Sequence, residues 1–328
     1  MATKLNRRSA EQALRNCTVV DPPLDALIAA LRSYGASGEL DVDNLTARYE
    51  QPFEPPYWRF LLETPAATLG EAPAAARRLA ISAKAPDFAR LGELTSLEAV
   101  LISNFHPRAL ASLAALPKLK CLALWSGPLA SLQGFGSLKG LEHLIVYGAS
   151  RLRSLDGLDE LRSLKTLRLE GIPGVKRLDP LGALDQLQGL ELNAGVQSGT
   201  LPDRTKFESL NPLRGLSSLK MLRMWGVRAE DDDLGPIAGL GPFEDIELPE
   251  RTFPLEAMAA AAAAHPQLLR KWSEPLRTVV PCGRCGEKKA VLIGRGTRDV
   301  CSRCLPRNIE EFFAAFEARV EESRRKLR

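Results

Sequence analysis

Leucine and other apolar residues recur through the middle of the chain in the pattern L-x-x-L-x-x-L-x-L. The pattern begins at residues 73, 94, 116, 138, 161, 184, 216 and 240, at intervals of 21, 22, 22, 23, 23, 32 and 24 residues. Such a period is the signature of a repeat architecture, because one unit cannot bury its apolar residues alone and neighbouring units stack to share a core.

The last positions of each repeat alternate between apolar and variable residues. Alternation with a period of two predicts a strand whose leucines face a core and whose intervening residues face outward. A second apolar set, such as Leu129, Leu132 and Phe135, is expected to close the other wall of that core. The alternation argues against a helical repeat, which is the nearest structural alternative.

This repeated phase resembles the leucine-rich-repeat family, and its spacing resembles the internalin type with 22-residue repeats. The resemblance covers about half of the chain, roughly residues 70–250. It implies an α/β fold, a leucine-rich-repeat solenoid with a parallel concave β-sheet and short or 3₁₀-like segments on the convex side. The chain departs from the family at the usual Asn after the strand, where only Asn193 clearly fits.

The flanking sequences predict four regions. Residues 1–72 form an N-terminal helical and aromatic cap region, and residues 73–250 form a solenoid of about eight repeats. Residues 251–279 form a C-terminal cap helix and linker, and residues 280–328 form a zinc module with a C-terminal amphipathic helix. Terminal repeats need a cover over the exposed end of the core. The aromatic cluster around residues 53–60 is read as such a cap, with a binding site as the alternative.

The expected strand register places aromatic and charged residues on the concave face. One outward column contains Trp125, Tyr147, Glu170 and Trp225, and the neighbouring column contains arginines. Trp, Tyr and Arg are the residues that most often anchor protein interfaces, and exposed aromatic patches usually mark a contact. We therefore predict a protein partner on this face, bound by Trp125, Tyr147, Arg168, Glu170, Arg223 and Trp225. The alternative is that caps or loops bury these rings.

Two Cys-x-x-Cys pairs lie near the C-terminus. Cys282 and Cys285 form the first, and after fifteen residues Cys301 and Cys304 form the second. This spacing is a strong signal for tetrahedral zinc bound by four cysteines. Four protein ligands leave no open position for water, so the zinc is expected to be structural.

The residues around these pairs predict a compact module. Lys289–Ile293 and Arg298–Val300 are expected to form a hairpin that turns at Gly294–Gly296. The apolar spacing after Pro306 predicts an amphipathic helix. Together with the two cysteine pairs, this order resembles a treble-clef or zinc-ribbon module.

The charge distribution suggests a second kind of partner. The chain carries a net charge of +4, but residues 276–328 contain thirteen Lys or Arg and seven Asp or Glu, a local balance of +6. Seven basic residues surround the metal site: Arg284, Lys288, Lys289, Arg295, Arg298, Arg303 and Arg307. Nucleic acid is therefore a possible ligand of the module, while a solvated basic surface is the simpler interpretation.

Composition and cysteine usage indicate a cellular location. Residues 1–17 lack the apolar segment of a signal peptide, and the longest apolar runs are shorter than the ~20 residues that cross a bilayer. Paired and isolated cysteines suit a reducing compartment. We expect a cytoplasmic protein without membrane contact, and bacterial from its Ala-, Arg- and Pro-rich usage and internalin-like period.

No catalytic residues are predicted. Cys121 and His143 are expected side by side on adjacent strands, the minimum for a thiol nucleophile. Thr166 follows in that column instead of an orienting carboxylate, so we read the pair as a packing coincidence. The sequence thus favours a non-enzymatic protein-interaction scaffold with an adaptor, inhibitor or immunity-type role. The alternative is a nucleic-acid-associated protein that uses the zinc module as reader.

Overall fold

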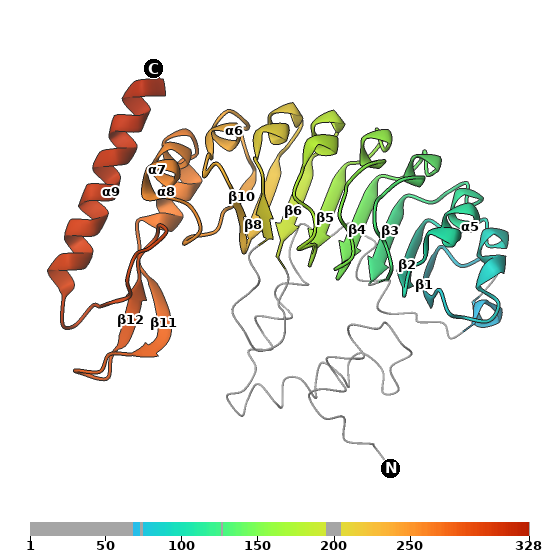
Figure 1. The fold of residues 1–328 in the computed structure, drawn as a ribbon, viewed down its shortest axis with the longest axis horizontal. Coiled ribbons are helices and arrows are strands. Elements are labelled where there is room, and N and C mark those ends of the chain that lie inside the picture. The colour runs from blue at the N-terminus through green and yellow to red at the C-terminus, as the bar shows by residue number, and fades with distance from the viewer. Residues whose placement is uncertain (1–67, 73–74, 126, 195–204, 328) are drawn as a thin grey trace, which may run out of the picture. The chain divides into compact units, whose positions relative to one another are not determined.

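The computed structural model describes residues 68–72, 75–125, 127–194 and 205–327. Eight short parallel strands form one sheet in the order of the chain (Figure 1). They are β1 (Arg78–Ser82), β2 (Ala99–Ser103), β3 (Cys121–Trp125), β4 (His143–Tyr147), β5 (Thr166–Glu170), β6 (Gly189–Asn193), β8 (Met221–Trp225) and β10 (Asp245–Glu247). Each strand begins five residues after the start of a repeat, at the position that the apolar alternation predicts.

Short turns of helix return the chain from one strand to the next. They are η1 (Leu69–Glu71), η2 (Phe88–Glu93), η3 (Pro107–Ala109), α5 (Leu110–Ala114), η4 (Phe135–Ser137), η5 (Leu158–Glu160), η6 (Asp179–Ala183), η7 (Asn211–Gly215) and α6 (Gly235–Ala238). Most are 3₁₀ turns, as the repeat length implies. The fold is a leucine-rich-repeat solenoid.

The repeat leucines form the core between the strands and these turns. Leu122 and Leu144 occupy equivalent positions in paired strands, and both are fully buried. Leu132 and Phe135, from the second apolar set, are equally buried. The core is therefore a stack of equivalent apolar layers, which is why a single repeat would not fold alone.

The chain divides into two compact units, an N-terminal unit that ends at Gly174 and a C-terminal unit that begins at Val175. The C-terminal unit contains a second, two-stranded parallel sheet of β7 (Thr205–Phe207) and β9 (Val227–Ala229). Thr205–Phe207 lies in the longest repeat interval, where the sequence pattern predicts no strand.

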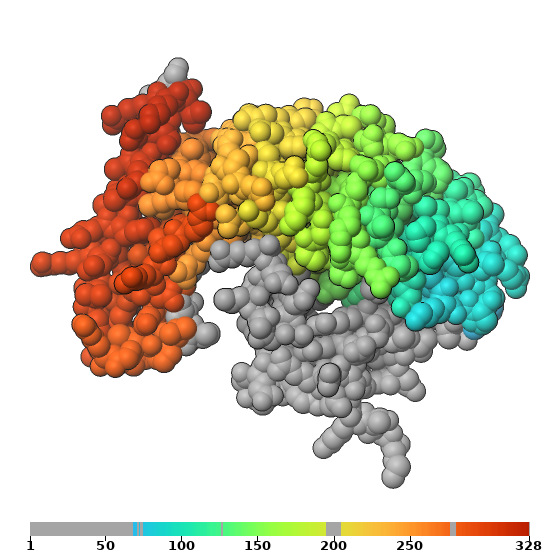
Figure 2. All heavy atoms as spheres, in the orientation of Figure 1, coloured from blue at the N-terminus to red at the C-terminus, as the bar shows by residue number. Residues whose placement is uncertain are grey.

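Two helices and the cysteine module follow the last repeat in the C-terminal unit. Helix α7 (Leu255–Ala264) contains the alanine run and ends before Pro266, and α8 (Pro266–Trp272) begins there. The module consists of β11 (Leu276–Pro281), β12 (Lys288–Val291), β13 (Val300–Cys301) and α9 (Pro306–Leu327). Helix α9 packs against α7, and their atoms adjoin in Figure 2.

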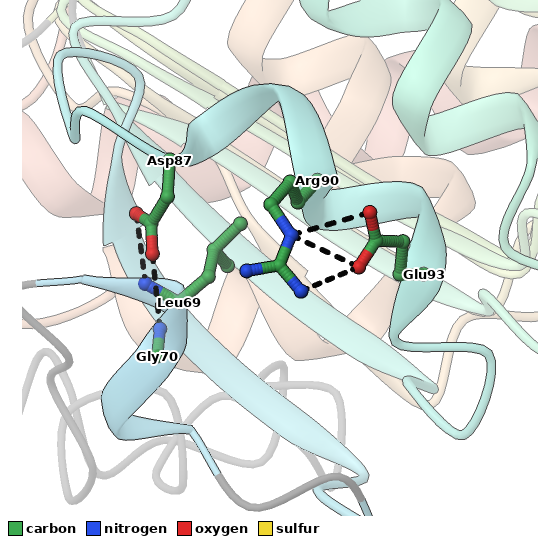
Figure 3. A network of polar contacts seen from close by, with 5 residues as sticks. All are labelled: Leu69, Gly70, Asp87, Arg90 and Glu93. Carbon is green, nitrogen blue, oxygen red and sulfur yellow. Dashed lines mark hydrogen bonds and ion pairs between the residues drawn. The ribbon is translucent and has the colours of Figure 1, made fainter.

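At the start of the N-terminal unit, one carboxylate holds the first turn in place (Figure 3). The backbone N–H groups of Leu69 and Gly70 each donate to Asp87, at 3.0 Å. These bonds, that from Leu69 above all, hold the pKa of Asp87 below its usual range. Nearby, Arg90 donates to both carboxylate oxygens of Glu93. The predicted cap residues 1–67 lie outside the described residues. Within the described part, no helix is long and apolar enough to span a bilayer.

Candidate metal centre and sheet face

Four cysteine sulfurs converge at one point of the C-terminal module. The Sγ atoms of Cys282, Cys285, Cys301 and Cys304 all lie within 4.8 Å of one another. Three of the separations are 3.4, 3.5 and 3.8 Å. A tetrahedral zinc ion with Zn–S bonds of about 2.3 Å requires sulfurs about 3.8 Å apart. The cluster therefore has the donor set and approximate dimensions of a four-thiolate metal site, as predicted.

Local backbone geometry supports the first cysteine pair. Gly286 adopts a left-handed conformation with φ 74°, and its N–H donates to the carbonyl of Cys282. Backbone N–H groups of Arg284 and Cys285 stabilise the thiolate of Cys282 and lower its pKa to about 6. The neighbouring sulfurs, that of Cys285 first, raise the pKa of Cys304 to about 12. Four adjacent thiolates repel one another, and a divalent cation is the group that removes this repulsion.

The rest of the module supports the cysteine cluster. Strands β12 and β13 pair antiparallel, and Gly294 and Gly296 in the turn have positive φ, so the predicted hairpin is confirmed. Ile309 and Phe313 of α9 are buried against Ala290 and Leu292. Phe313 is therefore a core residue of the module. Strand β11, which pairs with β12, was not predicted.

The predicted columns of the sheet face are present. In the N-terminal unit, Trp125 pairs in register with Ser103 on one side and Tyr147 on the other, and Tyr147 pairs with Glu170. The rings of Trp125 and Tyr147 meet edge to face, with centroids 4.9 Å apart. In the C-terminal unit, Trp225 pairs with Asn193.

The expectation that this face is fully exposed is wrong. Trp125 is only 4% exposed, and Glu170 and Arg223 are also buried. Tyr147 and Trp225 are partly exposed, whereas the Arg168 side chain is only 12% exposed. Trp125 belongs to an apolar cluster on the outer side of the sheet, whose other members are Ala80, Ala99, Leu101, Cys121, Ala123 and Ile145. Sequence alternation identifies which side of a strand a residue occupies but not whether that side is covered.

The charged residues of this face pair with carboxylates. In the N-terminal unit, Arg168 donates to Glu170 at 2.8 Å, and both side chains are about one-tenth exposed. In the C-terminal unit, Arg223 lies 2.6 Å from Asp245 on the neighbouring strand. These pairs fix the orientation of the guanidinium groups, because a bidentate or shared carboxylate restricts their rotation.

The Cys121–His143 pair is adjacent in register, as predicted, but it lacks the properties of a nucleophile. Cys121 is fully buried, and burial raises the pKa of its thiol to about 12. His143 Nδ1 lies 2.8 Å from the hydroxyl of Thr166, and burial lowers the pKa of the imidazole. A thiol with this pKa is protonated at neutral pH and is a poor nucleophile.

No known family model and no curated protein matches the chain. Solved structures with a similar fold include internalin C2 (22% identity, TM-score 0.36) and internalin F (20%, TM-score 0.36), both of Listeria monocytogenes, and a leucine-rich-repeat protein of Leptospira interrogans (18%, TM-score 0.34). The alignments cover 48%, 57% and 62% of this chain. They cover 66%, 56% and 63% of the matched chains, less than two thirds of each. These values are too low to inform the function of this chain.

Proposed function

We propose that the protein is a non-enzymatic interaction scaffold that binds a partner protein on the outer face of its sheet. The observation that carries the proposal is the presence of partly exposed aromatic residues on the outer side of parallel strands, Tyr147 in one unit and Trp225 in the other, each with an ion-paired arginine nearby. Such side chains give a large contact area and lose little conformational entropy on binding. Adaptor, inhibitor and immunity-type roles all fit this mode of action, in the reducing cytoplasm where the cysteines remain thiols or metal ligands.

The six predicted residues divide into contacting and positioning residues. Tyr147 and Trp225 are partly exposed and would contact the partner, and Arg168, whose side chain is 12% exposed, would add a smaller contact. Trp125 supports the ring of Tyr147, and Glu170 orients Arg168. Arg223, paired with Asp245, stands two residues before Trp225 on the same side of β8.

The metal is proposed to be zinc with a structural role. All four donors are cysteine sulfurs, and tetrahedral four-thiolate sites typically hold zinc that stabilises a fold. Ile309 and Phe313 pack beside the hairpin that carries Cys301, so metal binding would hold α9 in place.

Binding of nucleic acid by the cysteine module is the second candidate. The observation that favours it is the exposure of Arg284 and Arg303, the residues between the cysteines of the two pairs, together with Lys288 and Arg307. None of these four forms an ion pair with the described part of the chain. Phosphate groups would be contacted without base recognition, so this binding would depend steeply on salt.

One experiment separates the two candidates. Purified full-length protein is used as bait in cell lysate, with and without nuclease, beside a Tyr147→Ala/Trp225→Ala variant and an Arg284→Gln/Arg303→Gln variant. A stoichiometric protein that survives nuclease and is lost with the first variant supports the scaffold. Partner recovery that requires nucleic acid and is lost only with the second variant would instead support nucleic-acid binding by the cysteine module. Lys118→Gln/Lys139→Gln, which removes two exposed charges of the repeats, is the matched control.

A further inference from the structure

The N-terminal unit contains an open hollow of about 930 Å³ beyond the C-terminal ends of its first four strands. It is lined by the loops that follow β1 to β4 and by one side of η2, η3 and α5. Loops on a rigid scaffold are the usual location of binding residues. The hollow is separate from the sheet-face columns, because its residues follow the strands.

Basic side chains gather in this hollow. Lys84, Arg108 and Arg151 line it, each from a different repeat, and all three are exposed. They form no ion pair or hydrogen bond through their side chains with any described residue. Elsewhere in this unit basic residues pair with carboxylates, as Arg77 does with Glu98 and Lys165 with Glu142. Three cations without partners in one concave region favour an anionic ligand.

The acidic residues of the same repeats are held elsewhere. Residues 83–151 contain four of them, Asp87, Glu93, Glu98 and Glu142, and none lines the described hollow. Asp87 accepts from the backbone of η1, and Glu93 is held by Arg90 (Figure 3). Glu98 binds Arg77, and Glu142 binds Lys120 and Lys165. The positive charge of the hollow is therefore not neutralised from within these repeats.

Neutral donors add to the three cations. The Nδ1 atom of His106 accepts a hydrogen bond from the backbone N–H of Arg108 at 3.2 Å. This assigns the ring proton to Nε2, which remains available to donate to a ligand. Ser150 also lines the hollow, while the hydroxyl of Ser112, another lining residue, donates to the Ala89 carbonyl at 3.5 Å. Between these groups the wall is apolar, formed by Ala83, Ala85, Phe88, Ala89 and Ala109.

We infer that this hollow binds an acidic segment of the partner protein, with carboxylates spaced along an extended chain and small apolar side chains between them. The inference rests on the proposed function and names the chemistry of the partner. From the first to the fourth strand the hollow spans three strand spacings, about 14 Å. Alternate side chains of an extended peptide are about 7 Å apart, so carboxylates at every second position match cations distributed over that length. A single compact anion would use only part of the set.

The test is a titration of the full-length protein with a labelled, capped nonapeptide of alternating Asp and Ala, measured by fluorescence anisotropy at 50 mM salt. Lys84→Gln/Arg108→Gln/Arg151→Gln is expected to weaken binding roughly ten-fold or more, since each exposed pair contributes a few-fold. The control Lys118→Gln/Lys139→Gln is expected to change it less than two-fold. Raising salt to 300 mM should weaken wild-type binding, because exposed charges are screened.

Each of the following results would overturn the inference: no binding to the wild type at millimolar peptide, equal binding by the triple variant, or equal binding of a peptide with Asn in place of Asp. A single-stranded oligonucleotide of the same charge serves as competitor. Displacement of the peptide by the oligonucleotide at equal concentration would make this a general polyanion site and also overturn it.

The lysate capture distinguishes this failure from failure of the scaffold proposal. If the triple variant retains a partner that Tyr147→Ala/Trp225→Ala loses, the scaffold stands and the hollow does not contribute. If the wild type captures no protein, the scaffold proposal fails, while the peptide titration still decides whether the hollow binds acidic chains.

Discussion

Arg295 and Asp232 form a two-point ion pair within the C-terminal unit: Nη1 and Nη2 of the guanidinium each lie 2.6 Å from a different carboxylate oxygen. Arg295 stands in the turn of the cysteine module, and Asp232 follows β9. Two backbone bonds reinforce the contact, from the N–H of Gly294 to Glu250 and from that of Arg295 to Phe253. By sequence position Arg295 is one of seven basic residues of a candidate phosphate-binding surface, and this ion pair removes it from that set.

Replacing Asp232 by Asn should make the stability of the protein less dependent on pH. The pKa of Asp232 is lowered, chiefly by its hydrogen bond to Arg295. The pair therefore stabilises the fold above the unfolded pKa of about 3.9, and this contribution is lost as the pH falls through the lower folded pKa. At pH 7 we expect Asp232→Asn to reduce the free energy of unfolding by about 1 kcal/mol, given partial exposure.

Urea unfolding of wild type and Asp232→Asn, compared at each pH from 7 down to 3, checks this prediction. The difference between the two proteins should shrink at the acidic end. Glu274→Gln removes an exposed carboxylate of the same unit and should have little effect at any pH. Equal stability of wild type and Asp232→Asn at pH 7 would show that the ion pair contributes nothing.

Replacing Cys301 by Ser should abolish metal binding. A thiolate set that loses one donor loses much of its affinity for zinc, and folding of the module is coupled to that affinity. Elemental analysis after expression with zinc should give about one zinc per wild-type chain, and close to none for Cys301→Ser. Cys121→Ala is the control, because Cys121 is buried in the repeats and should leave the metal content unchanged. Metal-free wild type would contradict the prediction.

Trp125→Ala should destabilise the protein far more than Trp225→Ala. Trp125 is 4% exposed and packs in an apolar cluster, whereas Trp225 is half-buried. Truncation of a buried Trp costs about 3–5 kcal/mol, and a partly exposed ring should cost about half as much. Chemical unfolding followed by circular dichroism measures both values. Similar losses for the two variants would mean that Trp125 is exposed in solution.

Gly157→Ala and Gly148→Ala form a second matched pair. Both glycines have positive φ, 94° and 66°. An alanine Cβ at residue 157 would lie 2.3 Å from the carbonyl oxygen of Leu132, while at residue 148 it meets nothing within 4 Å. We expect Gly148→Ala to cost about 1–2 kcal/mol from backbone strain alone. Gly157→Ala should exceed that cost by at least about 2 kcal/mol, because backbone must move. Thermal unfolding of both variants measures these losses, and a larger loss for Gly148→Ala than for Gly157→Ala would refute the prediction.

The solenoid could be predicted because its information is local. Each strand is specified by two apolar residues two positions apart, and each repeat supplies the same pair, so the register of Leu122 opposite Leu144 follows from counting. The cysteine cluster could be predicted because each Cys-x-x-Cys pair positions two donors within one turn and the short hairpin between the pairs brings them together. For both features, a short stretch of sequence determines the geometry.

Features that depend on distant contacts could not be predicted. The alternation of apolar and variable residues along the strand predicts that Trp125 lies on the outer face, but the burial of its side chain depends on tertiary packing. Strand β7 (Thr205–Phe207) forms by pairing with β9 in the next repeat. Three residues are too few to show a strand pattern in the sequence. The hollow at the strand ends was missed because Lys84, Arg108 and Arg151 have no common spacing in the sequence, and only the stacking of repeats brings them to one edge.

The cysteine module is bonded to the segment that follows the last repeat of the C-terminal unit, so a metal ion bound by its four cysteines would affect the unfolding of these repeats. In a linear stack of repeats, the last repeat has one neighbour instead of two, so thermal fraying starts at that repeat. Here the cysteine module is a second neighbour of the last repeat, and its main chain is hydrogen-bonded to Glu250 and Phe253. In the zinc proposal, the bound ion holds the four thiolates together and thereby stabilises this neighbour. Loss of the ion, or oxidation of one cysteine pair, would therefore leave an unprotected end from which the stack opens one repeat at a time.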